Sequence, residues 1–226
     1  LVLALSVILV SFSRSFWLGL GVGLLFYYLI LIFRKEGRNI VRMSGVLLGA
    51  ALAAIILTLV IVKFPYPEPI GGFNAASLFS NRLSDMGEAA VSSRWQLLPP
   101  LWSSIKKAPV LGSGFGATIT YESKDPRIRQ SSATGEYTTY AFEWGWLDIW
   151  LKLGFFGLLV YLGLISKIIY DGFITKTNLG LGLGLGLIVI AAVSFFSPYT
   201  NHPLGIGYLI IAATAIERLK AGAALA

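Results

Sequence analysis

Long runs of apolar residues dominate the sequence, and they are not broken at the spacing of an amphipathic helix. A helix needs about 20 apolar residues to cross the hydrocarbon core of a bilayer. Hydrophobic residues make up 56% of the 226 residues and charged residues only 13%. Such a chain has too little polar surface to solvate a globule of its size. The runs expected to cross the bilayer are 16–33, 44–62, 142–170, 179–196 and 204–216.

A further apolar run at the start of the chain meets Arg14 before it is long enough to cross. We therefore expect residues 1–226 to form a single membrane domain, a fragment whose first helix is truncated. The predicted fold class is an all-α, polytopic integral membrane protein. It has about five to six transmembrane helices and one long external loop that contains an amphipathic helix.

Lysine and arginine residues predict the orientation of these helices. A basic cluster follows residue 33, and further basic residues follow the third and last spans. Cytoplasmic loops carry such an excess, so we place these segments in the cytoplasm. The loop at 63–141 is then external, and 142–226 forms the C-terminal transmembrane helices. The same bias, together with contact with the lipid bilayer, accounts for the net charge of +7, and nothing resembles a nucleic-acid-binding module.

Few side chains suited to metal binding are present. The chain has no cysteine and a single histidine, His202, so thiolate sites and histidine clusters are excluded, and we predict no metal and no cofactor. The alternating Leu-Gly run at 179–187 has the period of a strand. Because an isolated strand would leave backbone groups unpaired in lipid, we expect a helix whose small residues permit close packing.

The loop at 63–141 is too long for a simple connection, which favours a functional or disordered segment. A helix is predicted to start near Arg94, with apolar residues at helical spacing, and Pro99 and Pro100 should kink or restart it. It should end after Lys106 and Lys107. Its apolar positions are Leu97, Leu98, Leu101, Trp102 and Ile105. We expect this amphipathic helix to lie on the membrane surface.

Two segments follow this helix. The glycine-rich stretch at 112–116 lacks the Lys-Ser/Thr ending of a nucleotide-binding loop, so it is interpreted as a tight turn. The polar run from Tyr121 to Tyr140 is expected to be a flexible, exposed excursion that covers or lines a cavity.

Charged residues within or beside the apolar runs are candidate functional residues, because each is costly in a membrane unless it is paired, snorkels or has a function. Asp148 and Lys152 lie four residues apart, so pairing along one helical face is the favoured interpretation over catalysis. Glu143 stands among aromatic residues at the membrane boundary, where partial burial would raise the pKa of a carboxylate toward that of a useful base.

A set of short motifs carries a family resemblance. The set comprises Ser-Arg-Ser-Phe-Trp at 13–17, Arg94 followed fifteen residues later by Pro109, and Leu-Gly-Ser-Gly-Phe-Gly at 111–116. A polar loop then leads to Gly-Trp-Leu-Asp at 145–148 and Leu-Gly-Phe-Phe-Gly at 153–157. In order and spacing these motifs resemble the O-antigen ligase and O-antigen polymerase superfamily. The likeness covers essentially the whole chain, as the C-terminal half of such a protein.

The resemblance implies an enzyme of polysaccharide biosynthesis in the cell envelope, a carrier-dependent glycosyltransferase. It would transfer a glycan from an undecaprenyl-diphosphate-linked oligosaccharide to a glycan acceptor, without a metal, at the external or periplasmic face of the inner (cytoplasmic) membrane. Arg14 and Arg94 match the two essential arginines that hold the diphosphate, which makes both catalytic and substrate-binding candidates. Guanidinium groups suit a diphosphate because they bind it with paired hydrogen bonds. Trp95 and Asp148 are further substrate-binding candidates.

The sequence departs from the ligases at one position. They usually carry a histidine after the long loop, where this chain has Glu143, so Glu143 is the candidate catalytic base. His202 is the secondary candidate, although a lone histidine before a proline is more often a capping or interfacial residue. A transporter or flippase of lipid-linked glycans is the alternative function, with transport sites expected near broken helices at the bilayer midplane. A scaffold that binds no substrate is a third possibility and would lack a cavity.

Overall fold

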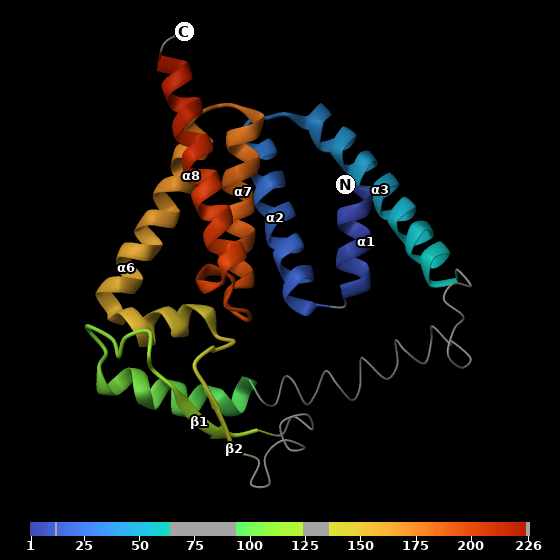
Figure 1. The fold of residues 1–226 in the computed structure, drawn as a ribbon. Helices are drawn as coiled ribbons and strands as arrows, with labels where there is room; N and C mark the ends of the chain where they lie inside the picture. The colour runs from blue at the N-terminus through green and yellow to red at the C-terminus, as the bar shows by residue number, and fades with distance from the viewer. Residues whose placement is uncertain (12, 64–93, 124–135, 225–226) are drawn as a thin grey trace. The chain divides into compact units, whose positions relative to one another are not determined.

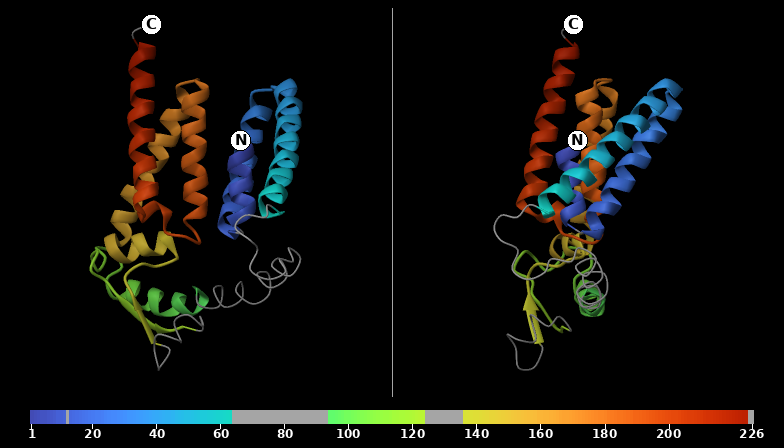
Figure 2. Two further views of the ribbon diagram at one scale, coloured as in Figure 1. Left: turned by 45° about the vertical axis from the view of Figure 1, so that its right-hand side comes forward. Right: turned by 90° about the vertical axis from the view of Figure 1, so that its right-hand side faces the viewer.

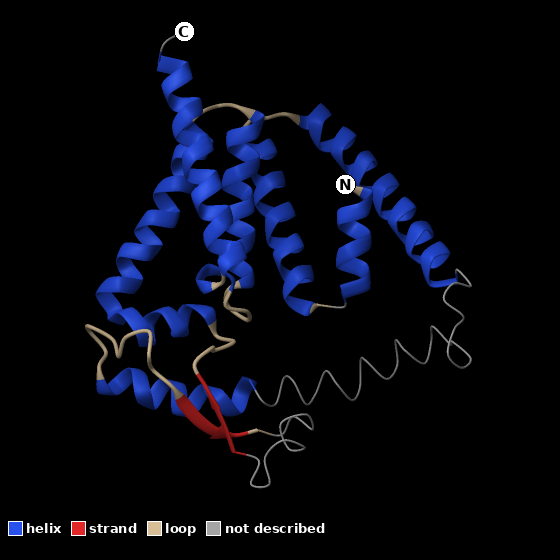
Figure 3. Ribbon diagram, viewed as in Figure 1, coloured by secondary structure: helices blue, strands red, loops and turns tan. Residues whose placement is uncertain are grey.

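A computed structural model of the chain describes residues 1–11, 13–63, 94–123 and 136–224. Figure 3 shows that most of the described residues are helical, with one short hairpin and a few loops. The chain divides into two units, residues 1–73 and 74–226, and each is described by itself. The prediction of an all-α, polytopic membrane protein is confirmed.

The described part of the first unit contains three helices, α1 (Val2–Ser11), α2 (Arg14–Phe33) and α3 (Gly37–Lys63). α1 packs on α3, where the Ser6 hydroxyl donates to the carbonyl of Ala54 at 3.4 Å. α2 and α3 are both long and apolar enough to cross a membrane. Their many exposed leucine, isoleucine and valine side chains are what a lipid-facing surface requires.

The second unit contains α6 (Gly145–Ile174), α7 (Asn178–Val193), a short 3-10 helix η1 (Tyr199–Asn201) and α8 (Pro203–Ala224). α6 is also long and apolar enough to cross a membrane, whereas α7 is apolar but shorter. Each of the five predicted apolar runs therefore contains a helix. The buried core of the three helices consists of Ile168, Leu187, Ala212 and Ile216.

The Leu-Gly run forms the first half of α7, which confirms the predicted helix. Gly186 is a point of close packing, because a Cβ atom placed there would overlap the side chain of Tyr208 on α8. The Tyr208 hydroxyl in turn donates to the carbonyl of Leu183 at 3.2 Å. The small residues thus let α8 lie close against α7.

Residues 94–107 form the predicted amphipathic helix, which ends after Lys107 as expected. It does not restart at the two prolines, because the helical conformation continues through Pro99 and Pro100. Its apolar side is buried in a second core, composed of Leu97, Leu101, Ile105, Ile119, Phe142 and Leu151. Residues from the loop and from the start of α6 share this core.

The polar run after the glycine-rich turn contains a β-hairpin, which the sequence analysis did not predict. Strand β1 (Ile119–Glu122) pairs antiparallel with β2 (Glu136–Thr139), with Ile119 opposite Thr139. The prediction of a flexible excursion is therefore wrong at both ends of the run. Residues 124–135 of that run lie outside the described residues.

α6 is not one straight helix. Gly154 has φ 71° and ψ −177°, a conformation that interrupts the helix near its start. Figures 1 and 2 show that the part before Gly154 lies crosswise to α7 and α8, beside the 94–107 helix, and that the part after it runs alongside them. Only the second part of the predicted span at 142–170 therefore lies alongside α7 and α8, and its first part lies across one end of these helices.

Candidate functional site

The glycine-rich turn closes the break in α6. The amides of Ser113 and Gly114 donate to the carbonyls of Leu151 and Lys152 at 2.7 and 3.0 Å. On the other side of the break, the amide of Phe155 donates to the carbonyl of Pro109 at 2.9 Å. A break in a helix leaves backbone amides and carbonyls without hydrogen-bond partners, and each unpaired group costs free energy in a membrane. The turn supplies the hydrogen bonds that the helix has lost.

Gly112 and Gly154 make this contact possible. Both have positive φ, and a Cβ atom on Gly154 would lie 2.2 Å from the carbonyl oxygen of Val110. The turn expected at 112–116 is confirmed, and its partner is the glycine motif at 153–157. Two motifs that are about 40 residues apart in the sequence thus form a single structural element.

Arg94 and Glu143, two of the three predicted catalytic residues, lie in contact. Arg94 Nε donates to Glu143 Oε2 at 2.5 Å. The two side chains are 31% and 48% exposed, so the pair is accessible to a ligand. This bond uses Nε alone, and the terminal guanidinium nitrogens have no partner within the part of the chain that the structure describes. Those nitrogens are the ones that form paired bonds to a phosphate.

Aromatic residues hold the pair in place. The indole nitrogen of Trp144 donates to the carbonyl of Arg94 at 3.0 Å, which ties the start of the 94–107 helix to the residue after Glu143. The rings of Trp95 and Trp144 lie 5.4 Å apart in an edge-to-face arrangement. Trp95 is more than half exposed beside the pair. A glycan or carrier bound at Arg94 would meet this ring.

Asp148 and Lys152 form an ion pair of 2.7 Å within the crosswise part of α6, as the favoured interpretation predicted. Their side chains are 1% and 7% exposed. The amide of Asn201, in η1, donates to the second oxygen of Asp148 at 2.7 Å. The network joins α6 to the turn before α8, so it fits a structural role in positioning these segments.

Arg14 and His202 lie at the starts of helices. Arg14 is the first residue of α2, where its side chain is exposed. It belongs to the first unit, whereas Arg94 belongs to the second. His202 precedes α8, and its Nδ1 accepts a hydrogen bond from the amide of Leu204 at 3.3 Å. This is the helix-capping arrangement that the sequence analysis favoured for His202.

A comparison with protein families found a match over residues 1–162 to the family described as O-antigen ligase. The chain belongs to the O-antigen ligase family. The match includes Arg14, Arg94, Glu143 and the crosswise part of α6. Comparisons with curated proteins and with solved structures found no match.

Membership in the O-antigen ligase family confirms the resemblance stated from the motifs. The family implies glycan transfer of the ligase or polymerase type, on lipid-linked glycan substrates in a membrane. Within the described residues, no three His, Cys, Asp or Glu side chains lie close enough together to hold a metal ion.

Sequence reasoning missed two features of this site. Asn201 was not singled out, although it is the polar residue next to His202 and closes the Asp148 network. The contact between Gly112 and Gly154 was also missed, because each motif was interpreted by itself. A glycine-rich motif in the loop and another within an apolar span were the available signals for a broken helix.

Proposed function

We propose that this protein transfers or polymerises a glycan from an undecaprenyl-diphosphate-linked donor onto a sugar acceptor. The reaction takes place at the external face of the cytoplasmic membrane and requires no metal. The observation that carries the proposal is the contact between Arg94 and Glu143, in a chain of the O-antigen ligase family.

Arg94 holds the diphosphate of the donor through its terminal guanidinium nitrogens, while its Nε stays bound to Glu143. As the glycosidic bond breaks, the leaving diphosphate gains negative charge. A fixed guanidinium stabilises that charge, and its planar group can bind two oxygens at once. Arg14 contributes the second guanidinium to the same diphosphate.

Glu143 acts as the base. Its carboxylate takes the proton of an acceptor sugar hydroxyl, and the hydroxyl oxygen attacks the anomeric carbon. The bond to the diphosphate breaks with its electron pair, which inverts the configuration at that carbon. Trp95 offers an apolar ring to the glycan or the carrier beside this pair.

A transfer assay tests the proposal. The purified protein in detergent micelles, supplied with an undecaprenyl-diphosphate-linked oligosaccharide and a glycan acceptor, should produce elongated or transferred glycan. Arg94→Lys should abolish most of this product, because an ammonium cannot reproduce the paired hydrogen bonds of a guanidinium. Arg218→Lys, an exposed arginine near the end of α8, is the matched control and should keep full activity. Full activity of Arg94→Lys would reject the role of Arg94.

The affinity for undecaprenyl diphosphate tests whether Arg14 and Arg94 bind the same diphosphate. If Arg14 and Arg94 bind one diphosphate, Arg14→Lys and Arg94→Lys should each weaken the binding of undecaprenyl diphosphate. An unchanged affinity of Arg14→Lys, beside a reduced affinity of Arg94→Lys, would place Arg14 outside the diphosphate site.

The break in α6 favours one second candidate, a transporter of lipid-linked glycans, because broken helices often mark transport sites. The same micelle assay separates the two functions. Transport needs two compartments and changes no covalent bond, whereas glycan transfer proceeds in micelles. Absence of product in micelles, together with movement of the donor across a vesicle membrane, would favour transport.

A further inference from the structure

The apolar side of the 94–107 helix is not available to the membrane. Leu97, Leu101 and Ile105 are buried in the core that the loop shares with the start of α6. A helix that lies on a bilayer buries this side among the lipids instead. Any contact of the loop with the bilayer must therefore come from other residues.

The glycine-rich turn that follows this helix lies at the end of the spanning part of α6. Its backbone is hydrogen-bonded to residues on both sides of the break at Gly154. From the break, α6 continues to Ile174, a length of about 30 Å for a helix. This length matches the thickness of the hydrocarbon core of a bilayer. The turn is therefore expected at the edge of that core, on the side of the loop.

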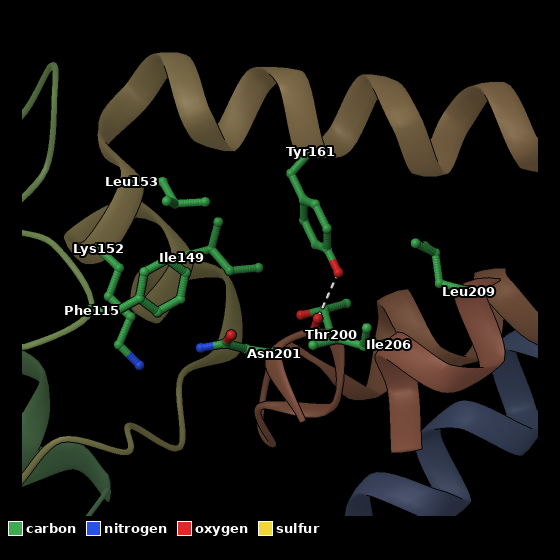
Figure 4. A pocket seen from close by; sticks show the side chains of 9 residues that line it. All are labelled: Phe115, Ile149, Lys152, Leu153, Tyr161, Thr200, Asn201, Ile206 and Leu209. Carbon is green, nitrogen blue, oxygen red and sulfur yellow. Dashed lines mark hydrogen bonds between the residues drawn. The ribbon is translucent and has the colours of Figure 1, made fainter. Parts of the chain in front are cut away.

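Apolar side chains of the turn are exposed at this edge. Val110 is about half exposed, and Leu111 is 82% exposed. Phe115 differs, because it has a partner within the protein. Figure 4 shows it beside Lys152, whose Nζ lies 5.9 Å from the centre of the ring. Leu111 is therefore the most exposed apolar side chain of the turn.

A row of aromatic rings connects the loop to the lipid-facing surface of α6. Trp102, on the 94–107 helix, contacts Trp150 edge to face, with 5.5 Å between the ring centres. Trp150 contacts Phe155 at 6.0 Å, and Phe155 contacts Phe156 at 6.3 Å. Trp102, Phe155 and Phe156 are all exposed. Because Phe156 belongs to the spanning part of α6, the apolar surface of the loop is continuous with that of a membrane helix.

Two lysines border this surface. Lys106 and Lys107 end the 94–107 helix, and both are exposed. The Nζ atom of Lys106 lies 6.0 Å from the centre of the Trp102 ring. Neither lysine forms an ion pair with a residue that the structure describes. The sequence from 94 to 121 contains no acidic residue, so this positive charge favours an external anion.

We propose that this surface, which we call the loop anchor, binds the bilayer on the side of the loop. The loop anchor consists of Trp102, Lys106, Lys107, Leu111 and Phe155. Leu111 and Phe155 enter the hydrocarbon core. Lys106 and Lys107 bind the phosphate of an anionic phospholipid. Tryptophan and lysine are side chains that anchor proteins at this depth.

Two observations favour a bilayer over a protein partner. The loop anchor is continuous with the lipid-facing surface of α6, and its charge is opposite to that of an anionic head group. The contact holds the 94–107 helix, which begins at Arg94, at the membrane surface. It is independent of the proposed glycan transfer, and its test needs no glycan substrate.

A fluorescent probe at position 111 tests the location. The chain contains no cysteine, so Leu111→Cys can be labelled alone with nitrobenzoxadiazole, in nanodiscs of phosphatidylcholine and phosphatidylglycerol. We expect blue-shifted emission and quenching by lipids with brominated acyl chains, as for Ile211→Cys at an exposed apolar position on α8. Glu122→Cys is the aqueous control, because the hairpin extends away from α7 and α8 (Figures 1 and 2). Its probe should be quenched by iodide.

Two outcomes at position 111 would overturn the proposal. Quenching of the Leu111→Cys probe by iodide and not by brominated lipid would place the turn in water. Quenching by neither agent would show that a protein surface covers the loop anchor.

The same labelled variant tests the class of lipid. Each lysine should enrich an anionic lipid beside it about fivefold, so brominated phosphatidylglycerol should quench more than an equal amount of brominated phosphatidylcholine. Adding Lys106→Gln and Lys107→Gln should abolish this preference. Adding Lys35→Gln and Lys176→Gln, which remove the same charge at exposed positions elsewhere, should preserve it. Equal quenching by the two brominated lipids before any lysine is changed would reject the binding of an anionic phospholipid.

Discussion

Gly112 and Gly154 meet backbone to backbone, so that a Cβ atom on Gly112 would lie 2.4 Å from the amide nitrogen of Gly154. This contact turns the first part of α6 aside and fixes the loop against it. Glu143 precedes that part of α6, and Arg94 begins the 94–107 helix, which ends shortly before the glycine-rich turn. The position of the candidate site therefore depends on two glycines that do not belong to it.

Replacing Gly154 by alanine should destabilise the protein. Its backbone conformation, with φ 71° and ψ −177°, lies in a region that is essentially restricted to glycine and makes an L-residue less favourable by roughly 1–3 kcal/mol. The new methyl group would also overlap the carbonyl of Val110. Gly163→Ala is the matched control on the same helix, because a Cβ atom there meets nothing within 4 Å. We expect Gly163→Ala to be neutral or stabilising by about 0.5–1 kcal/mol. Thermal unfolding in detergent measures both, and equal melting temperatures would contradict the role of the break.

The buried pair of Asp148 and Lys152 gives a second prediction. Lys152→Met leaves a carboxylate that is 1% exposed without its cation, which should cost about 3–5 kcal/mol of stability. Lys167→Met is the control, because Lys167 pairs with Asp171 at the same spacing on α6 but is 67% exposed. Its loss should stay below about 1 kcal/mol. Adding Asp148→Asn to Lys152→Met removes the unpaired carboxylate and should restore most of the stability. A further loss of stability would show that the unpaired carboxylate of Asp148 is not the cause of the destabilisation.

The role of His202 can be separated from catalysis by two substitutions. Asparagine is a good helix cap, so His202→Asn should retain both stability and glycan transfer. His202→Ala should lower stability by about 1 kcal/mol, because the amide of Leu204 loses its acceptor. Loss of transfer in His202→Asn without loss of stability would make His202 the base in place of Glu143.

The helices were predictable because the bilayer leaves a long apolar segment almost no alternative to a helix. The break at Gly154 was not, since the apolar composition of 142–170 continues through it and its hydrogen bonds come from a turn about 40 residues earlier. The hairpin was missed because its short strands are rich in polar residues, such as Thr120 and Thr138, whose hydroxyls bond to each other across the strands. Pattern analysis describes local segments, and these features depend on contacts between distant ones.

The candidate site was predictable in part. The motifs and the predicted topology placed Arg94 and Glu143 on one side of the membrane, and the structure brings them to 2.5 Å although 49 residues separate them. The sequence could not supply the bond from Trp144 to the carbonyl of Arg94 that fixes this approach, because it depends on how two helices pack. The pairing of Asp148 with Lys152 was predictable because it is local to one helix.

The turnover number of Glu143→Gln at saturating donor tests the central claim most directly. Glutamine keeps a hydrogen-bond acceptor for Arg94 but cannot take a proton, so donor affinity should change little. A positioned general base typically contributes about 10²–10⁴-fold to a rate. We predict a decrease of about 100-fold or more in the rate of glycan transfer, while the variant keeps its affinity for undecaprenyl diphosphate. An unchanged rate would contradict the assignment of Glu143 and the mechanism built on the Arg94 pair.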